Sequence, residues 1–174
     1  MNGSTQRLAA RMASLAWLAA ALAACTGLGG VRPLYGPVPG SVSLQLDAPP
    51  DAVAAAAAEE VQHLGLRVQW LSREEGYLET QWFDLTARSS SQEPAFSDLE
   101  RVVKMRFFAD PAAGKTRLLA ECVTTRLVDP SRPQRELERM APEGHAGREL
   151  LTQVLDRLRG RFPAEEPGRT TGPR

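Results

Sequence analysis

Apolar and polar residues alternate along several stretches of the chain, as they do in strands that bury one face. In residues 41–47 the apolar positions Val42, Leu44 and Leu46 share one face. Similar alternation, interrupted by turn residues, predicts further strands over residues 66–70, 77–85, 101–110 and 116–127. We therefore expect an antiparallel sheet of four or five strands.

Two other stretches place their apolar residues at helical spacing. The first begins at Pro49, Pro50 and Asp51, because proline is tolerated in a first turn and a carboxylate suits the positive end of the helix dipole. It continues through an alanine-rich run that ends before Gly65, a natural stop. The second helix covers residues 145–162, with an apolar stripe formed by Leu150, Leu151, Val154, Leu155, Leu158 and Phe162.

The predicted fold class is α+β, with the element order β-α-β-β-β-β-α and both helices on one face of the sheet. On the strand at residues 101–110, the side chains expected to face the core are Val103, Met105 and Phe107. The strand at residues 116–127 has two possible inner faces, Leu118/Ala120/Cys122 or Leu119/Val123/Leu127. The first is favoured, because it places Glu121 opposite the outward Lys104 and Arg106.

The N-terminal residues have the pattern of an export signal. Arg7 and Arg11 form a basic region, and residues 13–24 are apolar except for Ser14. This stretch is shorter than the roughly 20 residues needed to span a bilayer core. Without a twin-arginine pair, the general secretory route is the better interpretation. Residues 1–24 are therefore predicted to be a signal peptide.

The sequence Leu22-Ala23-Ala24-Cys25 resembles the lipobox of bacterial lipoproteins. The resemblance implies that the Cys25 thiol receives a diacylglycerol and that cleavage then exposes its amine. Two or three acyl chains would anchor the protein stably. Thr26 follows, in place of the Asp typical of inner-membrane retention, so we expect an outer-membrane lipoprotein facing the periplasm. The alternative is an ordinary signal peptide that contains a cysteine.

The remaining segments flank or connect the predicted domain. Residues 25–40 comprise the lipidated cysteine and a flexible tether, since they are rich in glycine and proline. The domain spans residues 41–162, with loops at residues 87–100 and 129–144, and residues 163–174 are expected to be a disordered tail.

Composition narrows the function classes. The 174 residues include 21 basic and 21 acidic side chains, and 43% of the residues are hydrophobic. Balanced charge argues against a strongly electropositive nucleic-acid binder or a polybasic membrane-surface protein. Two cysteines cannot form a disulfide framework, and two histidines offer little for a metal site. We expect no nucleic-acid partner, nucleotide, metal or other cofactor.

Two candidate catalytic motifs have simpler interpretations. Residues 109–116 resemble a relaxed phosphate-binding loop, but strand-like sequence follows where such a loop requires a helix. A hairpin turn over residues 110–114 is predicted instead. Cys122 with His63 or His145 could suggest a thiol nucleophile and a base. Cys122 is expected in the core, where cysteine behaves as a small apolar residue. No catalytic residues are assigned, and the protein is not expected to be an enzyme.

One sheet face could bind a partner protein. If Leu78, Thr80 and Trp82 point to the core, the opposite face combines aromatic rings with charge, which suits docking. The side chains expected on that face are Tyr77, Phe83, Lys104, Arg106 and Phe108. An equally weighted interpretation is that the loops at residues 87–100 and 129–144 cover this face.

Several short motifs together resemble the helix-grip domain of BamC-type (NlpB-like) lipoproteins. They are the lipobox, residues 46–51 at the start of the alanine-rich helix, Leu64-Gly65-Leu66, and Glu75-Gly76-Tyr77-Leu78-Glu79-Thr80-Gln81-Trp82. The resemblance covers residues 41–162, but that family has two such domains and a long N-terminal segment. It implies an accessory, non-enzymatic role in outer-membrane protein assembly or envelope scaffolding. The competing hypothesis is a binding module for a small apolar ligand in the groove between the long helix and the sheet.

Overall fold

The computed structural model describes residues 30–92, 101–125, 129 and 131–164. The chain divides into one unit at residues 1–30 and a second at residues 31–174, and the second contains the fold described here. The predicted signal peptide, Cys25 and most of the predicted tail lie outside the described residues.

The described chain is a mixed α+β fold, which confirms the predicted class. Its three helices are α2 (Pro50–His63), α3 (Gln134–Leu137) and α4 (Ala146–Arg161). Its strands are β1 (Val42–Leu46), β2 (Val68–Ser72), β3 (Tyr77–Thr80), β4 (Trp82–Asp84), β5 (Ser89–Ser91), β6 (Val102–Ala112), β7 (Lys115–Thr125) and β8 (Glu138–Met140). The eight strands exceed the four or five predicted, so the predicted strand count and element order were wrong.

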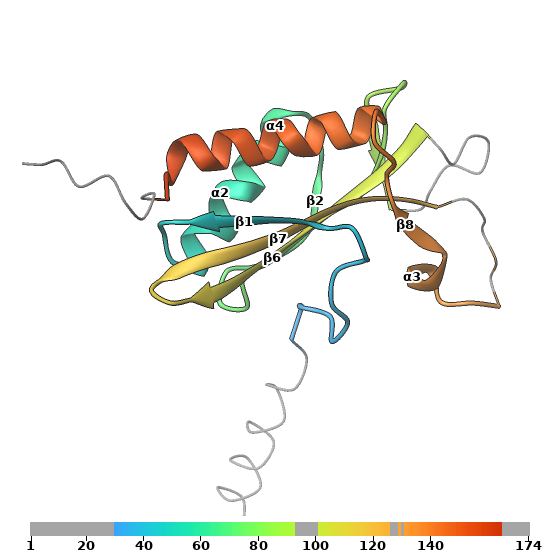
Figure 1. The fold of residues 1–174 in the computed structure, drawn as a ribbon. Coiled ribbons are helices and arrows are strands. Elements are labelled where there is room, and N and C mark those ends of the chain that lie inside the picture. Colours follow the sequence, from blue (N-terminus) through green and yellow to red (C-terminus); the bar gives the residue numbers. More distant parts are fainter. Residues whose placement is uncertain (1–29, 93–100, 126–128, 130, 165–174) are drawn as a thin grey trace, which may run out of the picture. The chain divides into compact units, whose positions relative to one another are not determined.

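The strands pair antiparallel in the order β1-β7-β6-β3-β2. β4 pairs with both β5 and β6, and β8 pairs with β7 beyond the end of β1. Figure 1 shows α2 and α4 on one side of the sheet, which we call the helix side. The blue segment before β1 runs along the other side, which we call the outer side.

The start and end of α2 follow the sequence signals. Pro49 is the N-cap residue in an extended conformation, Pro50 opens the first turn, and Asp51 supplies the acidic side chain there. Gly65 follows the helix with a φ of +89°, a left-handed conformation that favours glycine. The buried alanines of α2 (Ala54, Ala56, Ala57 and Ala58) allow the helix to approach its neighbours closely.

The main core lies between the helices and the sheet. Val103, Met105 and Phe107 contribute to it from β6, as predicted. From β7 it contains Leu118, Ala120 and Cys122, which confirms the favoured register of that strand. Arg106 pairs directly with Glu121, as that register requires.

The segment that resembled a phosphate-binding loop is a hairpin. β6 and β7 pair up to Ala112 and Lys115, leaving a two-residue turn. Both turn residues have positive φ, +48° at Ala113 and +79° at Gly114, as expected for a type I′ turn. A strand therefore follows the Gly-Lys-Thr sequence where a phosphate site would need a helix.

The predicted alternation fails at Gln81, between β3 and β4. The Gln81 amide donates to the carbonyl of Arg67, 2.8 Å away, and the alternation shifts by one residue. Trp82 consequently lies on the outer side, in a small cluster with Val38, Val102 and Val123. Phe83 lies in the main core on the helix side. The predicted faces of Trp82 and Phe83 were therefore wrong.

Two predicted loops contain regular structure. β5 lies within residues 87–100, and α3 and β8 lie within residues 129–144. No helix among the described residues combines the length and the apolar character needed to cross a membrane.

Two glycines of α4 allow its packing on the sheet to be tested. A Cβ at Gly147 would lie 2.6 Å from Val103 Cγ1 and 3.0 Å from Cys122 Sγ, whereas a Cβ at Gly160 would meet nothing within 4 Å. Gly147→Ala is therefore expected to lower the free energy of unfolding by about 1–3 kcal/mol through overpacking. Gly160→Ala should raise it by up to about 1 kcal/mol, because alanine favours helix. Urea unfolding of both variants checks this, and a stabilising Gly147→Ala would contradict the close packing.

Candidate functional site

The outer side of the sheet carries charged residues that are almost inaccessible to solvent. They form the charge cluster, which consists of Glu79, Lys104, Arg106, Glu121, Arg135 and Glu138. Five of the six are buried, and the Arg135 side chain is 18% exposed. Three carboxylates face three cations, so the cluster is formally neutral.

Arg106 is the centre of the cluster because of its place in the sheet. On β6 it stands in register with Glu79 on one side and Glu121 on the other. Its Nε donates to Glu79 Oε2 at 2.9 Å, and Nη1 donates to Glu121 Oε1 at 2.9 Å. Nη1 and Nη2 also donate to the two carboxylate oxygens of Glu138, at 2.6 and 2.9 Å. This bidentate geometry suits guanidinium and no other side chain.

Glu79 has three donors around it. Lys104 Nζ donates to its Oε1 at 2.8 Å, and the Tyr77 hydroxyl donates to Oε2 beside Arg106. Burial acts to raise the pKa of Glu79, but the charge of Arg106 and the hydrogen bond and charge of Lys104 outweigh it, so this pKa is lowered. Burial and the bond to Glu79 raise the pKa of Tyr77, so its phenol stays protonated.

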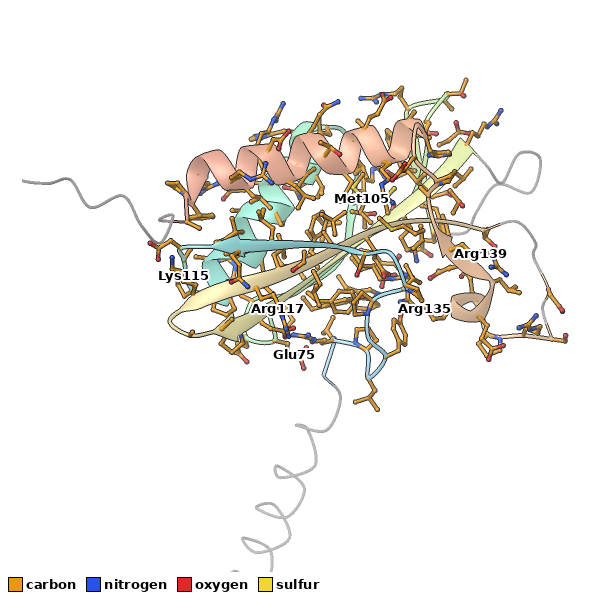
Figure 2. All side chains as sticks on the ribbon, in the orientation of Figure 1. Glu75, Met105, Lys115, Arg117, Arg135 and Arg139 are labelled. Atoms are coloured by element: carbon orange, nitrogen blue, oxygen red, sulfur yellow. The ribbon has the colours of Figure 1, made fainter. Side chains whose placement is uncertain are left out.

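Residues 31–40 lie against this cluster, although the sequence predicted a tether up to residue 40. The Val38 amide donates to Glu121 Oε2 at 2.6 Å, and Arg135 Nη2 donates to the carbonyl of Gly36 at 2.8 Å. Nearer the N-terminus, Arg32 pairs with Asp110 at 2.7 Å. Figure 2 shows Arg135 and Glu75 beside this blue segment, with Met105 on the helix side. The folded unit therefore begins at Val31.

Aromatic rings complete the cover. The Tyr35 ring lies under two guanidinium groups, 4.5 Å from Arg135 and 5.9 Å from Arg106. Burial raises the pKa of Tyr35. Arg32 stands 5.5 Å from the Phe108 ring, which in turn contacts Tyr77 at a centroid distance of 5.2 Å.

The predicted docking face is thus not exposed. Its five residues, Tyr77, Phe83, Lys104, Arg106 and Phe108, are each 5% exposed or less. Phe83 lies on the helix side, and the other four lie on the outer side beneath the protein's own chain. Residues 31–40 form the cover together with α3 and β8, which lie within residues 129–144. This agrees with the interpretation that the 129–144 segment covers the face, whereas residues 31–40 were not expected there. Residues 93–100 of the other suggested segment lie outside the described residues. Val102 and Phe108 are apolar residues on the outer side of β6, and apolar residues on that side indicate that another part of the chain covers it.

The charge cluster acts as a clamp between three segments of the chain. Every one of its six carboxylate oxygens accepts at least one hydrogen bond. The donors come from the sheet, from α3 and from residues 31–40, so the cluster fastens the start of the folded unit to the middle of the sheet. Residues 31–40 were not predicted to pack, because glycine- and proline-rich sequence has no periodicity to reveal packing. Arg135 and Glu138 were not singled out, because they lie in a run of mixed charge, residues 132–139, that is typical of a solvated segment.

The buried Cys122 thiol is not activated as a nucleophile. Cys122 is fully buried, and burial raises its pKa to about 12, the opposite of thiolate activation. His145 caps α4, its Nδ1 accepting from the amide of Gly147 at 3.1 Å. His63 lies at the end of α2, 3.7 Å from Glu60. Across the described ranges, no group of three His, Cys, Asp or Glu side chains lies suitably placed for a metal ion.

The groove assigned to an apolar ligand is filled by protein side chains. On the sheet-facing side of α4, Leu151, Val154 and Leu158 are 1% exposed or less. A pocket of about 240 Å³ lies instead near the start of α2, between the turn at residues 73–76 and Arg32. Its lining is Arg32, Pro50, Asp51, Arg73, Glu74, Glu75, Gly76, Ala109 and Pro111. The lining combines five charged side chains with proline, glycine and alanine.

Comparison with known proteins adds no family. No protein-family model matches the chain. No curated protein matches it either.

Proposed function

We propose that this protein is a lipid-anchored lipoprotein of the outer membrane, facing the periplasm, with a non-enzymatic role in outer-membrane protein assembly or envelope scaffolding. The observation that carries the proposal is the lipobox-like sequence Leu22-Ala23-Ala24-Cys25, followed closely by a folded unit that begins at Val31. Between the proposed anchor and the domain stand only residues 26–30.

The charge cluster limits how far the domain can lie from the proposed anchor. Six residues of fully extended chain reach about 20 Å, which limits the distance from Cys25 to Val31. Because residues 31–40 are fastened to the sheet, the domain cannot move farther from Cys25 than this short connection allows. The domain would then be presented next to the membrane surface, where a scaffold for envelope proteins has to act.

We further propose that the domain is of the helix-grip type found in BamC-type lipoproteins. The support is an antiparallel sheet with α2 and α4 on one side and the long α4 packed along it (Figure 1). The proline start of α2 and the segment from Glu75 to Trp82 are the motifs that suggest the resemblance. Partnership with barrel-assembly proteins rests on that resemblance.

Substituting the proposed anchor should prevent the protein from becoming a mature, membrane-bound lipoprotein. Cys25→Ala is expected to give a chain that is uncleaved or soluble, because no diacylglycerol can be attached. Cys122→Ala is the matched control, since Cys122 is the other cysteine of the chain and lies in the core. Fractionation of both variants is the measurement. A Cys25→Ala protein that still fractionates as a mature membrane protein would refute the anchor.

Co-purification from detergent-solubilised membranes tests the assembly role. Recovery of a barrel-assembly component with the wild-type chain would support it. Recovery of a bound lipid with no protein partner would contradict it and favour the ligand-binding hypothesis.

A further inference from the structure

Large apolar side chains are exposed on residues 31–35 and on the edge strand β2. Leu34 is fully exposed, and Val31 and Tyr35 are each 40% exposed. Trp70, on the edge strand β2, is 51% exposed. We call these four residues the apolar rim.

The apolar rim lies on the outer side of the sheet. Trp70 pairs with Glu79, which pairs with Arg106, and directly paired side chains share a face. Tyr35 covers Arg106 from the same side. Val31 and Leu34 belong to the segment that Tyr35 and Val38 hold against the sheet. The rim is therefore opposite α2 and α4.

The sequence places the apolar rim within reach of the bilayer that would hold the Cys25 lipid. Leu34 follows the proposed lipidated Cys25 by nine residues, and Val31 by six. Even fully extended, six residues of chain span only about 20 Å. Such a short connection keeps the rim at a high effective concentration near the bilayer that holds the lipid.

We propose that the apolar rim inserts into the headgroup region of the bilayer that carries the Cys25 lipid, and so fixes the orientation of the domain. The inference rests on the proposed lipid anchor. Tyrosine and tryptophan suit this depth, because an amphipathic ring can bury its apolar part while its polar tip stays hydrated. The neighbouring Arg32 is paired with Asp110, so apolar contact rather than attraction to anionic lipid holds the rim. The helix side then faces away from the membrane, toward the periplasm.

Fluorescence of the lipidated mature protein in phosphatidylethanolamine–phosphatidylglycerol vesicles tests the contact. Leu34→Cys is labelled with a polarity-sensitive dye, and Gln153→Cys on the exposed side of α4 is the matched control. The introduced thiol reacts selectively, because Cys122 is buried with a raised pKa and Cys25 carries the lipid. Nitroxide-labelled lipid is then added to the vesicles as a quencher.

We expect several-fold stronger quenching and a blue-shifted emission for the label at Leu34 than for the label at Gln153. Equal quenching at both positions, in protein that floats with the vesicles, would overturn the membrane contact and leave the anchor standing. A protein that does not float and carries no lipid mass would overturn the anchor, and the contact with it.

Discussion

Replacing Arg106 with methionine is expected to lower the free energy of unfolding by about 3–5 kcal/mol, because it leaves buried charges without their partner. Arg106 donates to Glu79, Glu121 and Glu138, and their carboxylates remain when the guanidinium is removed. Water cannot replace it, since the Arg106 side chain is only 3% exposed. Urea unfolding of the wild type and the variant at neutral pH measures the loss.

Arg117→Met is the matched control. Arg117 lies on β7, with its side chain 52% exposed and paired only loosely with Asp110, 4.0 Å away. Exposed pairs of this kind contribute roughly 0–1 kcal/mol, so the variant should stay close to the wild type. Equal effects at the two arginines would show that the charge cluster does not hold the fold together.

The stability of the wild type and that of Arg106→Met should respond differently to acid. The pKa of Glu79 is lowered in the fold from its ordinary value of 4.5, so its contribution to stability is present above pH 4.5 and is lost as pH falls through the lower folded value. In Arg106→Met, Glu79 loses the charge that lowers its pKa, so the pKa of Glu79 rises. Protonation then removes the uncompensated buried charge in the variant. The difference in the free energy of unfolding between the wild type and the variant should therefore narrow below pH 4.5.

Gly76→Ala should also be severely destabilising, by about 3 kcal/mol or more. Gly76 has a φ of +60°, and a Cβ there would lie 2.1 Å from the carbonyl oxygen of Ala109. That oxygen cannot move alone, because the Ala109 amide donates to the Gly76 carbonyl at 2.7 Å and the next pair, Tyr77 and Phe108, is in register. The strand pairing of β3 with β6 would have to shift.

Gly114→Ala separates two possible costs of Gly76→Ala, the strain of a positive φ and the close approach to the Ala109 carbonyl. Gly114 has a φ of +79°, but a Cβ there would meet nothing within 4 Å. Its cost should be only the left-handed conformation, about 1–2 kcal/mol. Thermal or urea unfolding of the two variants checks the difference, and equal losses would mean that the approach of Gly76 to Ala109 is unimportant.

Local signals predicted the parts of the fold that depend on neighbouring residues. The proline start of α2, the stop at Gly65 and the turn at Ala113 and Gly114 are each specified by a few residues. The register of β7 followed from pairing Glu121 with Arg106, a contact that the structure contains. These interactions need no knowledge of distant segments.

Features that depend on distant segments could not be predicted in the same way. The shift at Gln81 arises because its amide bonds to Arg67, and periodicity contains no trace of that bond. The burial of Lys104 and Arg106 depends on residues 31–40, which lie more than 60 positions earlier in the chain. Charged residues at alternate positions of a strand predict a face exposed to solvent. Here that face is buried, because residues 31–40, α3 and β8 pack over it.

Lipid attachment at Cys25 is the central claim, and the intact mass of the mature protein from membranes tests it most directly. The mature chain should begin at Cys25 and carry the added mass of a diacylglycerol and an N-linked acyl chain. A mature chain that begins elsewhere, or that begins at Cys25 with no lipid mass, would contradict it.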